Sequence, residues 1–324
     1  MNTTHLFRAS VFAVAAVLAA TSFTANVAFA AAPMVKKSAP GYYRIMLGDF
    51  EITALSDGTV PFPMDKLLTN TTPAKIAAAF KKYYVTNPVE TSVNVYLINT
   101  GSKLVMVDTG AAGLFGPTLG NLITNLKASG YEPEQIDEIY ITHMHGDHVG
   151  GLMAGDKLAF PNAIVRGDQH DADFWLSEAN MNKAAEGDKG AFKGAMDSIN
   201  PYVKAGKYKP FSGNTELVPG VSALVRKGHT PGHATYVVES KGEKLELWGD
   251  LMHVAALQFD NPSVTIKFDS DNKAAAQQRK QAYSAAAKSG TLVGATHISF
   301  PGLGRLRASG SGYIWVPINY TPIR

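Results

Sequence analysis

The segment Thr142–His148 constrains the fold of this chain more than any other part of its sequence. Its order is His-x-His-x-Asp-His, and it directly follows Glu138–Thr142, which has the character of a buried strand. Two histidines two residues apart can turn toward one ion, and the Asp-His pair after them can reach a second ion. Gly146 permits a tight backbone path between the two pairs. We therefore interpret this segment as a metal-binding motif.

Other side chains of metal-ligand type also follow predicted strands. Asp250 and His297 each come at the end of a strand, and His229 and His233 frame a His-Thr-Pro-Gly-His turn between two strands. Ligands gather at strand ends in layered α/β proteins, so these distant segments can converge on one site. The chain has no cysteine, so any metal must be bound by imidazole and carboxylate groups, which suit zinc and similar ions.

Strand-like and helix-like stretches alternate along the chain, which predicts a layered α/β fold. The length of 324 residues fits one large domain or two small ones. The clearest helix is Asn272–Ser289, with Asp271 as its N-cap and Gly290 as the residue that ends it. Further predicted strands cover 42–47, 50–55, 92–99, 103–107, 221–226, 234–239, 244–248, 291–295 and 313–316. Further predicted helices cover 73–84 and a stretch that starts at Leu119 and is closed by Gly130.

The N-terminus has the pattern of an export signal. A positively charged start precedes an uncharged apolar run over Val11–Ala20, and an Ala-x-Ala cleavage pattern ends at Ala30. The run is short for a membrane span, so we expect cleavage after Ala30 rather than a retained anchor. This predicts a signal peptide over 1–30, a flexible tail over 31–40, one domain over 41–324, and a periplasmic or secreted mature protein.

The charge of the chain argues against a nucleic-acid partner. The formal net charge is +3, and no run of lysine or arginine exceeds two residues, so the sequence has no basic stripe. We expect a small-molecule partner, no nucleic acid and no stable membrane insertion. The sequence leaves a homodimer open.

The order His-x-His-x-Asp-His, then Thr-Pro-Gly-His, then a strand-end aspartate and a late histidine resembles the metallo-β-lactamase superfamily over about residues 40–324. The resemblance implies an αββα sandwich, in which two packed sheets carry helices on their outer faces and the site lies at one edge between them. It also implies a hydrolase that uses a hydroxide held between two divalent metal ions, with zinc preferred and manganese, cobalt or iron also suited to the ligands.

The resemblance further assigns the metal ligands. One ion would be held by His143, His145 and His233, and the other by Asp147, His148 and His297, with Asp250 bridging both. In this pattern the histidine of Pro-Gly-His is the ligand, so we assign His233 rather than His229. Asp147 and Asp250 are also the candidate catalytic residues.

Several polar residues near these motifs have less definite roles. Asp108 ends a predicted strand, and we expect it to orient a ligand histidine or the neighbouring loop, although a simple turn former is a comparable interpretation. His229 is expected to be structural or to support a ligand. Contributions of His170 and His253 to the pocket are left open.

The segment His297–Arg305, together with Asp171–Trp175, is similar to the methyl parathion hydrolase group, whose relatives include lactonases. This resemblance implies that Phe115, Trp175 and Phe192 flank the substrate, although such residues usually pack in cores. The first hypothesis is thus an exported hydrolase of organophosphate triesters. The alternative is a lactonase or esterase on the same site, such as one that opens acyl-homoserine lactones. A non-catalytic periplasmic metal-binding protein is the third hypothesis.

Overall fold

A computed structural model describes residues 32–323 of the chain. The proposed signal peptide over 1–30 lies outside the described residues. The chain divides into two units after Ser38, and the described part of the first unit, 32–38, contains no helix or strand. Among the described residues, none of the helices combines the length and apolar character that a bilayer crossing requires.

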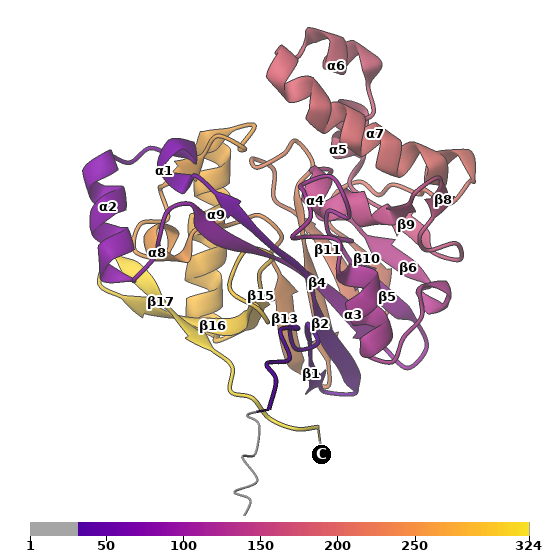
Figure 1. The fold of residues 1–324 in the computed structure, drawn as a ribbon, viewed down its shortest axis with the longest axis horizontal. Coiled ribbons are helices and arrows are strands. Elements are labelled where there is room, and N and C mark those ends of the chain that lie inside the picture. The colour runs from indigo at the N-terminus through magenta and orange to yellow at the C-terminus, as the bar shows by residue number, and fades with distance from the viewer. Residues whose placement is uncertain (1–31, 324) are drawn as a thin grey trace, which may run out of the picture. The chain divides into compact units, whose positions relative to one another are not determined.

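The second unit, from Ala39 onward, is the αββα sandwich that the resemblance implies, with two mixed sheets face to face and helices outside them (Figure 1). The first sheet has the order β1-β2-β4-β5-β6-β9 and the second has the order β10-β11-β12-β13-β15-β16-β17. The strands of the first sheet are β1 (Tyr42–Leu47), β2 (Phe50–Phe62), β4 (Val89–Asn99), β5 (Leu104–Val107), β6 (Glu138–Tyr140) and β9 (Ile164–Arg166).

The second sheet is built from the later part of the chain. Its strands are β10 (Thr215–Val218), β11 (Val221–Val225), β12 (Ala234–Ser240), β13 (Glu243–Leu247), β15 (Leu292–Gly294), β16 (Leu303–Ser309) and β17 (Gly312–Pro317). Two short pairs complete the strands, β3 (Leu68–Thr69) with β14 (Thr265–Ile266) and β7 (Met153–Ala154) with β8 (Lys157–Leu158).

The central strand β4 shows why the two sheets pack together. Tyr96 and Ile98 belong to the core between the sheets, while the alternate residues Val95 and Leu97 belong to the core under the outer helices. Successive side chains of a strand point to opposite faces, so a strand covered on both sides is buried throughout its middle. This accounts for the continuous burial of β4 from Thr91 to Ile98.

Helices cover the outer faces of both sheets. α3, α5 and α7 contribute to the core on the first sheet, and α9 contributes to the core on the second. The helices are α1 (Met64–Leu67), α2 (Pro73–Lys82), α3 (Leu122–Ala128), α4 (Gly146–Val149), α5 (Gln169–Trp175), α6 (Glu178–Lys183), α7 (Lys189–Lys204), α8 (Ala255–Gln258) and α9 (Asn272–Ser289).

Helix ends follow local chemistry. α9 has the predicted bounds, because Asp271 accepts a hydrogen bond from the Ala274 backbone N–H at 2.9 Å and Gly290 takes the left-handed conformation at φ 67°. α2 ends at Lys82, two residues before the predicted end, because Tyr84 has a positive φ of 55°, which no helix continues through.

The strand ends that carry the polar motifs lie at one edge of the sandwich. β5 pairs in parallel with β6, and β13 pairs in parallel with β15, so the carboxyl ends within each pair point the same way. Asp108 follows β5, the Thr142–His148 segment follows β6, Asp250 follows β13 and His297 follows β15. The two sheets therefore each bring two of these segments to the candidate site.

Candidate metal centre

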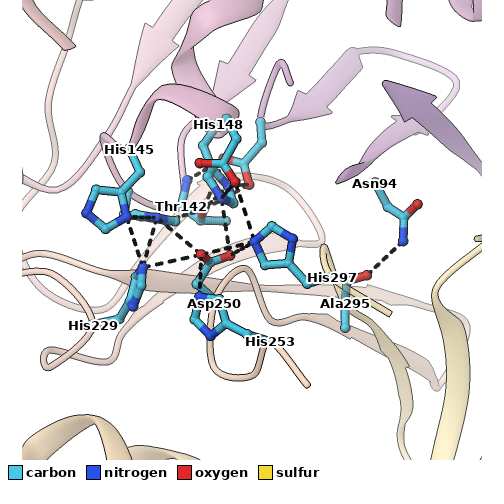
Figure 2. Close-up of polar contacts among 12 residues, drawn as sticks. Asn94, Thr142, His145, His148, His229, Asp250, His253, Ala295 and His297 are labelled. Atoms are coloured by element: carbon cyan, nitrogen blue, oxygen red, sulfur yellow. Dashed lines mark hydrogen bonds and ion pairs between the residues drawn. The ribbon is translucent and has the colours of Figure 1, made fainter. Parts of the chain in front are cut away.

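Three histidines form the first group of side chains at this edge. His229 Nε2 lies 3.2 Å from His143 Nε2 and 3.1 Å from His145 Nδ1, and the latter two nitrogens are 3.0 Å apart. Figure 2 shows His145 and His229 facing the same space beside Asp250. Because three ring nitrogens point at one place, this group can hold a metal ion together with a carboxylate.

A second group lies beside the first and contains Asp147, His148 and His297. Asp147 Oδ2 is 3.6 Å from His148 Nε2 and 3.5 Å from His297 Nε2. Asp147 and His148 lie on α4, within the predicted Thr142–His148 motif, whereas His297 follows β15 of the opposite sheet.

The carboxylate of Asp250 lies between the two groups (Figure 2). Its Oδ2 is 3.3 Å from His229 Nε2 and 3.6 Å from His143 Nε2. Its Oδ1 is 3.2 Å from both His148 Nε2 and His297 Nε2. Its Oδ2 is also 3.2 Å from His297 Nε2, so the carboxylate as a whole lies within reach of both groups, as a carboxylate shared by two ions must.

The outward nitrogens of the histidines are held by hydrogen bonds. His148 Nδ1 donates to Asp108 Oδ2 at 2.8 Å, and His297 Nδ1 donates to the Ser92 carbonyl at 2.9 Å. His229 Nδ1 donates to Asp269 Oδ1, also at 2.9 Å. A histidine that donates through one nitrogen presents a lone pair on the other, so each Nε2 is free to bind a metal.

Two buried atoms at the centre fit metal ligation. His148 Nε2 and Asp250 Oδ1 are buried and have no hydrogen-bond partner in the described structure. Buried polar atoms are normally paired, so these two atoms call for a further partner of positive charge. Nitrogen and carboxylate oxygen are the donors that zinc and related divalent ions prefer. The two groups thus fit two metal ions.

Electrostatics favours the protonation state that a metal requires at His143, His145 and Asp250. Burial holds the pKa of His143 and of His145 well below the usual range, which keeps both rings neutral. Burial acts to raise the pKa of the Asp250 carboxyl, but the positive fields of His148 and the other surrounding histidines outweigh it. They hold that pKa well below its usual value, so the carboxylate stays ionised.

At His148, His229 and His297, burial acts to lower the pKa but the nearby carboxylates outweigh it. They raise the pKa of all three rings, that of His229 to about 9, so a metal ion would have to displace a proton there.

The structure corrects the choice of His233 over His229. His233 is fully buried and its Nε2 accepts a hydrogen bond from the Asp250 backbone N–H at 3.0 Å, so this nitrogen faces the backbone and not the metal groups. Burial lowers the pKa of His233 to about 3, which keeps the ring a neutral acceptor. The motif His-Thr-Pro-Gly-His therefore contributes its first histidine to the centre and its second to the support of Asp250.

The structure separates the histidines that the sequence left open. His253 lies at the centre, with Nε2 3.1 Å from Asp250 Oδ2. His170 contacts Asp168 and Lys227 instead, at 2.8 and 3.0 Å. Asp108 Oδ2 lies 2.8 Å from Nδ1 of His148, a histidine of the centre.

Two supporting residues carry no local signal in the sequence. Asp269 precedes α9 in an Asp-Ser-Asp run that resembles an ordinary helix start, yet its carboxylate holds His229. Asn94 lies in the middle of β4 and its Nδ2 donates to the carbonyls of Ala295 and Ile298, which fixes the loop that carries His297.

A cavity of about 880 Å³ opens onto the centre. His145, Asp147, Asp250, His253 and His297 form its polar end, and its aromatic lining consists of Phe62, Phe115, Phe174, Trp175, Phe192 and Phe268. All three aromatic residues suggested by the sequence lie here, and Trp175 and Phe192 also pack in the core of the first sheet. The Trp175 ring centre is 5.1 Å from that of His145 and 4.7 Å from that of Phe192. The cavity therefore presents an apolar wall directly beside the metal groups.

Comparison with known proteins gives matches to one superfamily. The sequence profile described as "Metallo-beta-lactamase superfamily" matches residues 88–287. A crystal structure of hydrolase AbOPH in the beta lactamase superfamily is 36% identical, with a TM-score of 0.84 over 88% of this chain and 100% of that one.

Two lactonases are also similar. AidC, a dizinc quorum-quenching lactonase solved with its product N-hexanoyl-L-homoserine, is 25% identical, with a TM-score of 0.80 over 87% of this chain and 99% of that one. An N-acyl homoserine lactonase from Bacillus sp. is 30% identical over 165 residues, which are 45% of this chain. The chain spans only 58% of the length of that lactonase.

Proposed function

Because the chain belongs to the metallo-β-lactamase superfamily, we propose that it is a two-metal hydrolase that opens lactone rings. The observation that carries the proposal is the position of the Asp250 carboxylate, which lies within reach of both groups of ligands at the polar end of an aromatic cavity. Acyl-homoserine lactones are the first substrates to test, because AidC and the Bacillus protein are lactonases of that kind.

The proposed ligands divide between two ions. His143, His145 and His229 would hold the first, Asp147, His148 and His297 would hold the second, and Asp250 would be shared. Zinc is the preferred metal, because the donor set suits it and AidC is a dizinc enzyme. Bound divalent ions lower the pKa of water and stabilise negative charge on a carbonyl oxygen.

The protein's own residues orient both the centre and the substrate. Asp108, Asp269 and the Ser92 carbonyl fix the rings of three proposed ligands, so these ligands need no rearrangement when a metal binds. Trp175 and Phe192 form a rigid apolar wall that can bind an acyl or aryl group and exclude water from beside the reacting carbonyl.

Organophosphate triesters, which the sequence suggested first, become the second candidate substrates. The aromatic lining of the cavity could bind the aryl group of such a triester, and the similarity to hydrolase AbOPH supports a hydrolase without naming its substrate. The similarity to two lactonases is the reason for ranking lactones first for this chain. The test compares kcat/KM for N-hexanoyl-homoserine lactone, an aryl lactone and an aryl phosphotriester on zinc-loaded protein. A phosphotriester preference of orders of magnitude over both lactones would overturn the proposal.

We predict that chelation of the metals abolishes lactone hydrolysis without unfolding the protein. The aromatic and aliphatic cores do not depend on the metals, whereas the proposed chemistry does. Elemental analysis should find two ions per chain before chelation, and zinc should restore the rate afterwards. Full activity in chelated protein that retains fewer than about 0.1 metal ions per chain would contradict a metal-dependent reaction.

We predict that Phe115→Ala raises KM for an acyl-homoserine lactone about fivefold to tenfold with little change in kcat. Phe115 lines the cavity but is 39% exposed, so its loss removes about 1 kcal/mol of apolar contact with substrate and little stability. Tyr84→Ala is the matched control, because Tyr84 is 96% exposed and is not part of the cavity lining. Equal steady-state constants for Phe115→Ala and the unmodified protein would remove Phe115 from the substrate site.

A further inference from the structure

We propose that Asp171 is a positioning residue that fixes the two ligand-bearing loops to each other and to the aromatic wall of the cavity. The first loop is Thr142–His148 and the second is His229–His233. The inference rests on the proposed metal site, although its test does not require that lactones be the substrate.

Asp171 contacts both loops through three hydrogen bonds. Its Oδ2 accepts from the Met144 backbone N–H at 3.0 Å and from Thr230 Oγ1 at 2.9 Å, and its Oδ1 accepts from the Gly232 backbone N–H at 2.5 Å. Met144 lies between His143 and His145 of the first loop, and Thr230 directly follows His229. Two of the contacts are therefore one residue from a proposed ligand, and the third, Gly232, is one residue before His233, the end of the second loop.

A carboxylate suits this position better than any other side chain. Asp171 is only 1% exposed, and all three of its partners are donors. A carboxylate accepts through both oxygens, whereas an asparagine amide would turn one N–H₂ group toward a donor. Hydrogen bonds to a charged acceptor are also about twice as strong as neutral ones, so they fix the two loops firmly.

The helix that carries Asp171 also carries part of the cavity wall. Trp175 comes one helical turn later on α5, and residues four apart lie on the same face of a helix. The Trp175 ring lies beside that of His145, with centres 5.1 Å apart. Helix α5 thus holds the two loops at its start and a wall of the cavity at its end. A shift at Asp171 would move the ligands and the wall relative to each other.

The test compares Asp171→Asn with Asp173→Asn, the same substitution on an exposed position of α5. Zinc affinity is measured by competition with a chromophoric chelator, and the unfolding midpoint of the metal-free protein is measured separately. We expect Asp171→Asn to weaken zinc binding about 10-fold to 100-fold and to lower kcat/KM with zinc saturating, while Asp173→Asn changes neither. A lower unfolding midpoint with unchanged zinc affinity and kcat/KM would show a merely structural role and overturn the proposal.

Thr230→Val provides a second variant in case Asp171→Asn does not fold. It removes one donor to Asp171 and keeps the volume of the side chain, and Thr230→Ser, which keeps the hydroxyl, is its control. We expect Thr230→Val to weaken zinc binding about threefold to tenfold and Thr230→Ser to restore it. Equal zinc affinities for both variants and the unmodified protein would contradict the proposal. If the unmodified protein does not hydrolyse lactones, only the proposed substrate is refuted, because zinc affinity still reports on the role of Asp171.

Discussion

Asp250→Asn is expected to lower kcat/KM by at least about 100-fold and to weaken retention of at least one metal ion, while the protein keeps its fold. Replacing a residue that only supports a metal ligand already lowers metal affinity or activity about 10-fold to 100-fold. Asp250 faces both groups of ligands directly, so its replacement should cost more. An amide has one oxygen and no charge, so it cannot face both groups in the same way. The measurements are metal content after gel filtration and steady-state kinetics.

Asp260→Asn is the control for this substitution, because Asp260 is exposed and pairs with Lys82 on the surface. Circular dichroism of both variants should match the unmodified protein. Unchanged metal content and activity in Asp250→Asn would show that the shared role of this carboxylate is misassigned.

His229→Ala is expected to lose one metal ion per chain and at least about 100-fold in kcat/KM, because it removes a proposed ligand of the first ion. His233→Gln is expected to keep both ions and to lose about 1–3 kcal/mol of unfolding free energy. His233 is a buried acceptor for the Asp250 N–H, and that donor would be left with a poorer partner.

The pair of variants separates two assignments of one motif. Metal analysis and chemical denaturation of the same samples report the two quantities independently. If His233→Gln loses an ion and His229→Ala retains both, then the second histidine of the motif is the ligand and the arrangement described above is wrong.

Features that depend on contacts between residues close together in the chain could be predicted from the sequence. Helix α9 was predicted to the residue, because Asp271 and Gly290 set its ends through contacts within a few residues. The motif from His143 to His148 was also apparent, since its ligands are neighbours in the chain.

Which of His229 and His233 faces the metal centre is not determined by contacts between neighbouring residues of the chain. It depends on how the turn between β11 and β12 lies against later segments of the chain, where His229 meets Asp269 before α9 and His233 meets the Asp250 backbone after β13. Asp171 and Asp269 were missed for the same reason, because their partners are between 27 and 61 residues away in the chain. Spacing patterns carry no information about such contacts.

The division of the two sheets along the chain has a consequence for assembly of the centre. Strands of the first sheet all precede residue 167 and those of the second all follow residue 214, so the N-terminal half supplies the Thr142–His148 ligands alone and the C-terminal half supplies His229, Asp250 and His297. Neither half holds a complete set for either ion. Bound metals would therefore cross-link the halves, and a chain nicked between them should stay associated while the metals are present and separate more readily once they are withdrawn.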